Sequence, residues 1–136
     1  MPAVLLDTCA MIFIADGRRL AASARREISA ALVSDGVLVS PISAWEIGLL
    51  SARRGFPFHP DPKRWFQSFL AYPGVRLTPL SPEIAIESSF LPPPVHGDPA
   101  DRLLIATARA LGVPIVTRDR RILDYARAGF IAAVPC

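Results

Sequence analysis

The chain has 136 residues, 51% of them hydrophobic, and a formal net charge of +3 with a pI near 9.4. This length predicts one domain over residues 1–136 and leaves no room for a second. The mean hydropathy is +0.36. However, Asp7 and Asp16 interrupt the amino-terminal apolar run, and no stretch approaches the roughly 18 residues of a membrane span, which excludes a membrane protein.

The cysteine content and the amino-terminal segment bear on the cellular compartment. Cys9 and Cys136 are too few for a disulfide framework or a zinc site, and no basic leader precedes a hydrophobic stretch. We therefore expect a cytoplasmic protein that keeps its thiols reduced. Cys9 is expected to be a small buried residue.

The first half of the chain predicts two short strands, each followed by helical sequence. The expected elements are a strand at 4–6, a helix at 8–15, an amphipathic helix at 18–34, a strand at 37–39 and a helix at 43–54. Asp7 directly follows the first strand. Ser43 and Glu46 have the spacing of a capping box, which places Glu46 in the first turn of its helix.

The second half repeats the alternation of strands and helices. The expected elements are a proline-broken loop at 56–62, a helix at 63–71, a strand at 75–77, a helix at 82–90, a helix at 99–111, a strand at 113–117, a helix from about 119 to 128 and an edge strand at 130–134. Asp98 is expected to cap the helix that Pro99 begins, with Asp101 at its third position. Gly112 and Pro114 end that helix.

This order of elements predicts an α/β fold, a three-layer α/β/α sandwich with a central, mostly parallel sheet. In such a sheet the carboxyl ends of the strands and the amino ends of the following helices share one edge, where ligands bind. Asp7 and Asp119 follow strands, whereas Glu46 and Asp101 begin helices. We therefore expect these four acids to converge on that edge.

Four clustered carboxylates predict a bound cation. Two unit charges about 4 Å apart at an effective dielectric constant of about 20 repel by roughly 4 kcal/mol, a large share of a domain's stability. Oxygen ligands without histidine or cysteine favour Mg²⁺ or Mn²⁺ over zinc. Taken singly, Glu46, Asp101 and Asp119 could each be a plain acid at a helix start; together they favour a site.

The basic residues suggest a polyanionic partner. Lys63 is the only lysine among fifteen basic residues. Many arginines lie close together in sequence: Arg18, Arg19, Arg25, Arg26, Arg53, Arg54, Arg118, Arg120 and Arg121. The planar guanidinium group binds phosphate in a bidentate manner, so RNA is a reasonable partner, although solvated helix faces explain any single pair equally well.

The remaining aromatic and histidine residues have simpler interpretations. His59 and His96 lie in proline-rich loops and are expected at the surface, with RNA contact by His96 as the lesser alternative. Trp45 and Trp65 lie among aliphatic residues at helical spacing, which favours packing in the core or in a dimer over stacking on bases.

Four stretches together resemble the PIN-domain ribonucleases, and closely the VapC toxins of bacterial and archaeal toxin–antitoxin pairs. They are LLDTCAM around Asp7, SAWEIGLL around Glu46, HGDPADRLLIATA around Asp101 and IVTRDRRIL around Asp119. They span nearly the whole chain in the family's order. The resemblance implies a PIN-like fold, a metal-dependent endoribonuclease that acts as the toxin of a type II toxin–antitoxin pair, a homodimer, and a VapB-like antitoxin whose tail covers the acidic site.

The expected reaction is hydrolysis of RNA phosphodiester bonds with Mg²⁺ or Mn²⁺. In a two-metal site, ions about 3.5 to 4 Å apart act on the attacking water and on the leaving oxygen, so no side-chain nucleophile is needed. We assign Asp7 and Asp101 as principal ligands, completed by Glu46 and Asp119 directly or through water. The residues expected to orient these carboxylates are Thr8, Ser43 and Thr117, with Asp98 as either a helix cap or a member of this set.

There are two alternatives to a nuclease, and the first is a phosphoaspartyl receiver or a phosphatase, which gathers acids in a comparable way. Phosphoaspartyl receivers and haloacid-dehalogenase-type phosphatases use a lysine near the phosphorylated aspartate, but Lys63 is predicted far from the acids. The second alternative is a catalytically weak PIN-fold module that only captures an antitoxin. The presence of all four acids favours the nuclease.

Overall fold

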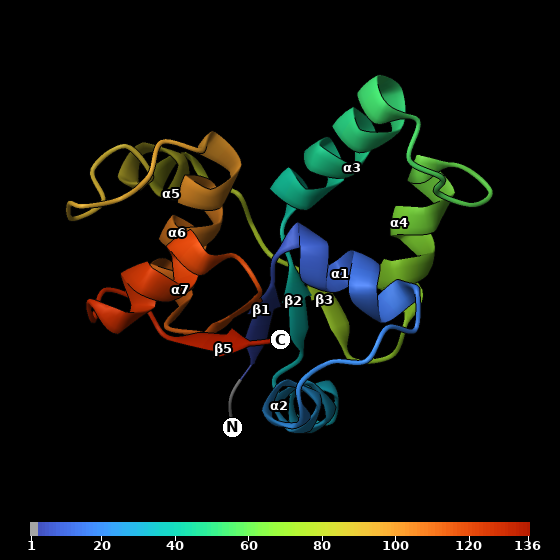
Figure 1. The fold of residues 1–136 in the computed structure, drawn as a ribbon, viewed down its shortest axis with the longest axis horizontal. Coiled ribbons are helices and arrows are strands. Elements are labelled where there is room, and N and C mark those ends of the chain that lie inside the picture. Colours follow the sequence, from blue (N-terminus) through green and yellow to red (C-terminus); the bar gives the residue numbers. More distant parts are fainter. Residues whose placement is uncertain (1–2) are drawn as a thin grey trace.

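A five-stranded parallel sheet forms the centre of the structure, a computed structural model in which residues 3–136 are described (Figure 1). Its strands are β1 (Val4–Leu6), β2 (Val37–Val39), β3 (Val75–Leu77), β4 (Ile115–Thr117) and β5 (Ala133–Pro135). The strand order is β3-β2-β1-β4-β5, and every neighbouring pair is parallel. The predicted α/β class is therefore confirmed.

Helices cover both faces of this sheet. They are α1 (Thr8–Ala15), α2 (Ala22–Leu32), α3 (Pro41–Arg54), α4 (Pro62–Ala71), α5 (Pro82–Glu87), α6 (Pro99–Leu111) and α7 (Arg120–Arg127). None of these helices, within residues 3–136, combines the length and the apolar character needed to cross a bilayer.

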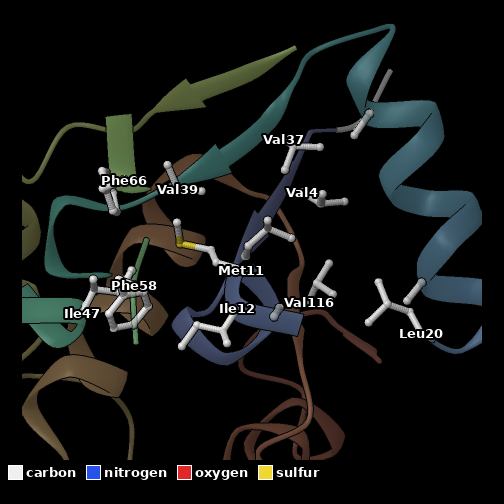
Figure 2. Close-up of a cluster of buried hydrophobic side chains, with 14 residues drawn as sticks. Val4, Met11, Ile12, Leu20, Val37, Val39, Ile47, Phe58, Phe66 and Val116 are labelled. Atoms are coloured by element: carbon white, nitrogen blue, oxygen red, sulfur yellow. The ribbon is translucent and has the colours of Figure 1, made fainter. Parts of the chain in front are cut away.

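Alternating side chains of the strands build two separate cores. Val4 and Leu6 of β1 pack with α1, α2 and α4 in one cluster, which Figure 2 shows. Leu5, between them, packs with α5, α6 and α7 in the other. β4 alternates in the same way, with Val116 in the first cluster and Ile115 in the second. A strand buried on both faces needs apolar residues throughout, which explains why β1 and β4 read as unbroken apolar runs.

Several predicted boundaries differ from the structure. The helix expected at 18–34 spans only Ala22–Leu32, because the Arg18 amide bonds back to the Phe13 carbonyl at the end of α1 and residues 18–21 form a loop. The strand expected at 113–117 starts at Ile115, because the Val113 amide still bonds the Ala108 carbonyl at the end of α6. The last strand lies at 133–135 rather than 130–134, and the helix expected at 82–90 ends at Glu87.

The start of α3 corrects the predicted capping box. Ser40 is the N-cap, and its hydroxyl accepts from the Ile42 amide at 3.1 Å. Pro41 occupies the first helical position, where its missing N–H costs nothing. Ser43 is therefore a buried residue inside the first turn, and Glu46 lies one turn deeper in the helix than predicted.

Candidate active site

The four predicted acids lie around one cleft at the carboxyl edge of the sheet. β1 leads into α1 and β2 into α3 at this edge (Figure 1). The cleft has a volume of about 310 Å³. Its lining residues are Asp7, Thr8, Cys9, Phe13, Glu46, Asp98, Asp101, Arg118, Asp119 and Arg121. The structure thus brings together side chains from α1, α3, α6 and α7, as well as the ends of β1 and β4.

Asp7 is the most deeply buried of the four acids, with 5% of its surface exposed. Its Oδ1 caps α1 by accepting from the Ala10 amide at 2.7 Å, and its Oδ2 accepts from the Thr117 hydroxyl. Burial raises the pKa of Asp7 to about 6, against the lowering effect of these two hydrogen bonds. The charges of Asp101 and Asp119 contribute to this raised value. This carboxylate is therefore costly to ionise in the metal-free protein.

Glu46 is held by a pair of hydroxyl groups. Thr8 Oγ1 lies 2.5 Å from Glu46 Oε1 and 2.9 Å from Ser43 Oγ. Because a hydroxyl has one proton and a carboxylate only accepts, Thr8 donates to Glu46 and accepts from Ser43. Burial raises the pKa of Glu46, the Thr8 hydrogen bond opposes this, and the charges of Asp101 and Asp98 add to it.

Asp101 sits in the first turn of α6, where several groups contact it. Asp98 caps the helix, its Oδ1 accepting from the Asp101 amide at 3.1 Å. His96 Nε2 donates to Asp101 Oδ2 at 2.8 Å, and Arg121 Nη2 lies 3.6 Å from the same oxygen. Burial raises the pKa of Asp101, the His96 hydrogen bond lowers it, and the charges of Asp98 and Asp119 raise it.

Asp119 differs from the other three acids because a cation compensates it. Its Oδ1 caps α7 by accepting from the Arg121 amide at 2.8 Å, and its Oδ2 lies 3.3 Å from Arg121 Nη2. Burial opposes ionisation, but the hydrogen bonds and the charge of Arg121 outweigh it and lower the pKa of Asp119. The Thr117 hydroxyl accepts from the Asp119 amide at 2.9 Å while donating to Asp7, so one hydroxyl connects two acids.

His96 was expected at the surface, and the structure corrects this. Only 14% of its side chain is exposed, and its imidazole contacts Asp101. Arg102 anchors the loop by donating to the carbonyls of Ser88 at 3.0 Å and His96 at 3.4 Å. The sequence contained a weak signal, since a residue just before a helix N-cap can fold back onto the first turn. His59 is exposed, as predicted.

Cys9 was expected to be buried, but it is exposed at the cleft. Partial desolvation of its thiol, together with the charges of Asp7 and Glu46, raises its pKa to about 11. The thiol therefore stays protonated at neutral pH.

Trp65 packs against Phe58 and Phe69, with ring centroids 5.0 Å and 5.8 Å away, whereas Trp45 is 53% exposed.

The chemistry of the cleft fits a hard divalent cation. Within residues 3–136, no three carboxylate, imidazole or thiol groups form a ready-made coordination shell. The donor set is nevertheless one of carboxylate oxygens, and burial and mutual repulsion raise the pKa values of Asp7, Glu46 and Asp101. A cation that binds these oxygens would relieve this repulsion, and oxygen donors suit Mg²⁺ or Mn²⁺.

Comparison with known proteins gives the family. The sequence model of the PIN domain matches residues 4–128. Ribonuclease VapC22 of Mycobacterium tuberculosis (strain ATCC 25618 / H37Rv) is 34% identical over 126 residues, which cover 92% of this chain and 93% of that protein.

Solved structures agree in fold. VapBC2 from Rickettsia felis, bound to a promoter DNA fragment, has a TM-score of 0.66 at 12% identity and covers 98% of both chains. DNA-bound VapBC from Salmonella typhimurium has a TM-score of 0.66 at 18% identity, covering 99% of this chain and 98% of that one. At these identities the likeness concerns the fold alone. The matched family and the VapC22 similarity together establish that the chain belongs to the PIN domain family, as a VapC-type member.

Proposed function

We propose that this chain is a metal-dependent endoribonuclease that acts as the toxin of a type II toxin–antitoxin pair. The observation that carries the proposal is the convergence of Asp7, Glu46, Asp101 and Asp119 on one cleft of a VapC-type PIN domain. The similarity to a protein named as a ribonuclease supports RNA as the substrate. We also infer a cytoplasmic location, which suits its two free thiols and which cell fractionation would test.

Asp7 and Asp101 would be the principal metal ligands, with Glu46 and Asp119 completing the site directly or through water. When bound, Mg²⁺ or Mn²⁺ supplies Lewis-acid activation of water and stabilises the charge that develops on the leaving oxygen. The buried hydroxyls of Thr8 and Thr117 hold the carboxylates of Glu46 and Asp7 in fixed orientations.

The thiol and hydroxyl groups in and beside the cleft are poorly suited to act as nucleophiles, which supports attack by water. The Cys9 thiol is protonated at neutral pH because of its raised pKa. The hydroxyls of Thr8 and Thr117 donate to carboxylates and are committed to that role. Asp119 stays ionised at neutral pH because Arg121 lowers its pKa.

The first prediction concerns cleavage. In the presence of Mn²⁺, the purified, antitoxin-free chain is expected to cut structured RNA or tRNA, and Asp101→Asn is expected to lose at least about 100-fold in rate because it removes a ligand charge. The control is Asp124→Asn, since Asp124 is exposed and pairs with Arg127 away from the cleft. Sequencing of RNA ends after brief induction measures the effect in cells. If the wild type leaves these RNAs intact and Asp7→Asn changes no phenotype on expression, the chain is an antitoxin-capture module and not a nuclease.

The second prediction concerns pH and stability without metal. The pKa of Asp7 is about 6 in the folded protein against an ordinary 3.8. Folding therefore favours the protonated form, and this contribution to stability is full below the ordinary pKa and is lost as pH rises through 6. In chelator, this group is expected to increase the free energy of unfolding by about 1.3 kcal/mol from pH 7 to pH 5, and by about 3 kcal/mol in total once the pH falls below 3.8.

The variant Asp7→Asn provides the check, because it retains an oxygen that can cap α1. It is expected to unfold at a higher temperature than the wild type at pH 7 in chelator, and to lose the part of the pH dependence that Asp7 contributes. Glu46 and Asp101 also have raised pKa values, so they too make the free energy of unfolding increase as the pH falls from 7 to 5. The lowered pKa of Asp119 affects the free energy of unfolding only at lower pH. A wild-type profile that is flat between pH 5 and 7 would show that the carboxylates do not destabilise the metal-free fold.

The third prediction concerns His96, which we propose orients Asp101 for metal binding. His96→Ala is expected to weaken Mn²⁺ binding by about 10- to 100-fold, the usual effect of removing a partner of a ligand. His96→Gln, which keeps an N–H donor, is expected to recover part of the loss. His59→Ala is the matched control, because His59 is the other histidine and is exposed. Calorimetric titration measures the affinities; equal binding by wild type and His96→Ala would refute this role.

The fourth prediction concerns assembly with a VapB-like antitoxin and with a second copy. Several of the solved relatives are named as VapBC or toxin–antitoxin complexes. A hollow of about 510 Å³ has mainly apolar walls from α1, α2 and α4, and we propose that it receives an apolar segment of the antitoxin. Exposed apolar residues on other surfaces, among them Trp45 and Phe90, are available for a homodimer.

Light scattering after co-expression with the cognate antitoxin tests both parts. The chain alone is expected at twice its mass of 14.7 kDa, and the wild type is expected to elute with antitoxin. Tyr72→Glu adds a charge at an exposed residue of the hollow and should weaken the complex at least tenfold. Leu111→Glu, exposed on α6 and outside the hollow, should not. If the chain alone is a monomer, the proposed homodimer is wrong. If Tyr72→Glu and Leu111→Glu bind the antitoxin equally well, the proposed antitoxin site in the hollow is wrong.

A further inference from the structure

Phe13 connects the acidic cleft to a group of arginines. It lies on α1 one turn after Cys9, and both residues line the cleft. Two guanidinium carbons pack on its ring, that of Arg118 at 4.3 Å and that of Arg18 at 5.0 Å from the ring centroid. Arg118 also donates from Nη2 to the Arg19 carbonyl at 3.1 Å. The ring therefore fixes two arginines that are far apart in sequence beside the four acids.

The arginines continue beyond Phe13 into a second hollow. This hollow has a volume of about 470 Å³ and lies along the chain segment that runs from α1 into α2 (Figure 1). Arg18, Arg19 and Arg25 line it, and no acidic side chain does. Among the ion pairs within residues 3–136, none involves these three arginines or Arg118. Their positive charge is thus not neutralised by a paired carboxylate.

We propose that this surface, formed by Arg118, Phe13, Arg18, Arg19 and Arg25 and here called the arginine track, binds the backbone phosphates of the RNA substrate next to the bond that is cut. The inference rests on the proposed function and names where its substrate lies. The track adjoins the cleft through Phe13, which lines the cleft and contacts Arg18.

Charge explains why such a track is needed. A polyanion that approaches four carboxylates is repelled, and ions in the cleft neutralise this only locally. A neighbouring row of unpaired arginines supplies attraction at longer range and binds phosphates through planar forks. Packing on Phe13 also restricts the rotamers of Arg18 and Arg118 before RNA binds, which reduces the entropy lost on binding. Because guanidinium groups already cover the Phe13 ring, the track suits backbone phosphates better than stacked bases.

The test compares two pairs of exposed arginines. Arg19→Ala/Arg25→Ala removes side chains of the track, and Arg53→Ala/Arg54→Ala removes the same charge at the end of α3, outside the cleft and the track. Fluorescence anisotropy with a labelled single-stranded RNA in chelator measures binding without cleavage. At low salt, the track variant is expected to bind the RNA at least tenfold more weakly. The slope of the logarithm of the binding constant against the logarithm of the salt concentration should become shallower by about 0.7 for each lost phosphate contact. The control should stay within twofold of wild type.

Cleavage assays with Mn²⁺ complete the test. The track variant is expected to raise KM while kcat stays within about twofold, since neither arginine reaches the acids. If both double variants weaken RNA binding equally, or if neither weakens it, the proposed arginine track is wrong. Retained RNA binding with loss of antitoxin binding would also overturn it and would assign the surface to the protein partner. If the wild type cuts no RNA, the proposed function fails by itself, and the anisotropy result still decides whether the track binds RNA.

Discussion

The structure depends on keeping the carboxylate of Asp7 in an almost fully buried position at the end of β1. Two hydrogen bonds offset part of its desolvation, one from the Ala10 amide and one from the Thr117 hydroxyl. The first requires α1 to start directly at the strand end, and the second requires β4 to lie beside β1. Both conditions are met by the parallel β1–β4 pairing, in which Leu6 lies opposite Val116. Local helix geometry and the sheet order are thus fixed around the same side chain.

Much of this arrangement could be predicted because its signals are local. Asp98 with Pro99 begins α6, Asp119 begins α7, and Gly55 and Gly112 end helices in left-handed conformations. Apolar runs bounded by such signals located β1, β2 and β3 within a residue. Convergence of the acids then followed from the geometry of parallel sheets, since strand ends and helix starts share an edge.

The errors arose where contacts distant in sequence decide the outcome. A capping box at Ser43 was a reasonable interpretation of spacing, but Ser40 and Pro41 start the helix earlier and leave Ser43 to bond Thr8, 35 residues away. The positions of His96 and Cys9 depend on which wall of the cleft each faces. Hydrophobicity carries no information on that choice, and for His96 the position just before a helix N-cap is only a weak signal. The same holds for Arg118, whose contacts with Phe13 and Arg19 cross the fold.

The small net charge of +3 conceals a strong separation of charge. Three acids with raised pKa values share the cleft, and Arg121 offsets part of their charge by pairing with Asp119 and by reaching Asp101 at 3.6 Å. The arginines on and beyond Phe13 remain unpaired within residues 3–136. A fold selected only for stability would bring these opposite charges together, because each isolated group costs desolvation or repulsion. Arg118 packs on Phe13 at the cleft and Arg18 packs on the same ring, so unpaired positive charge adjoins the carboxylates without neutralising them.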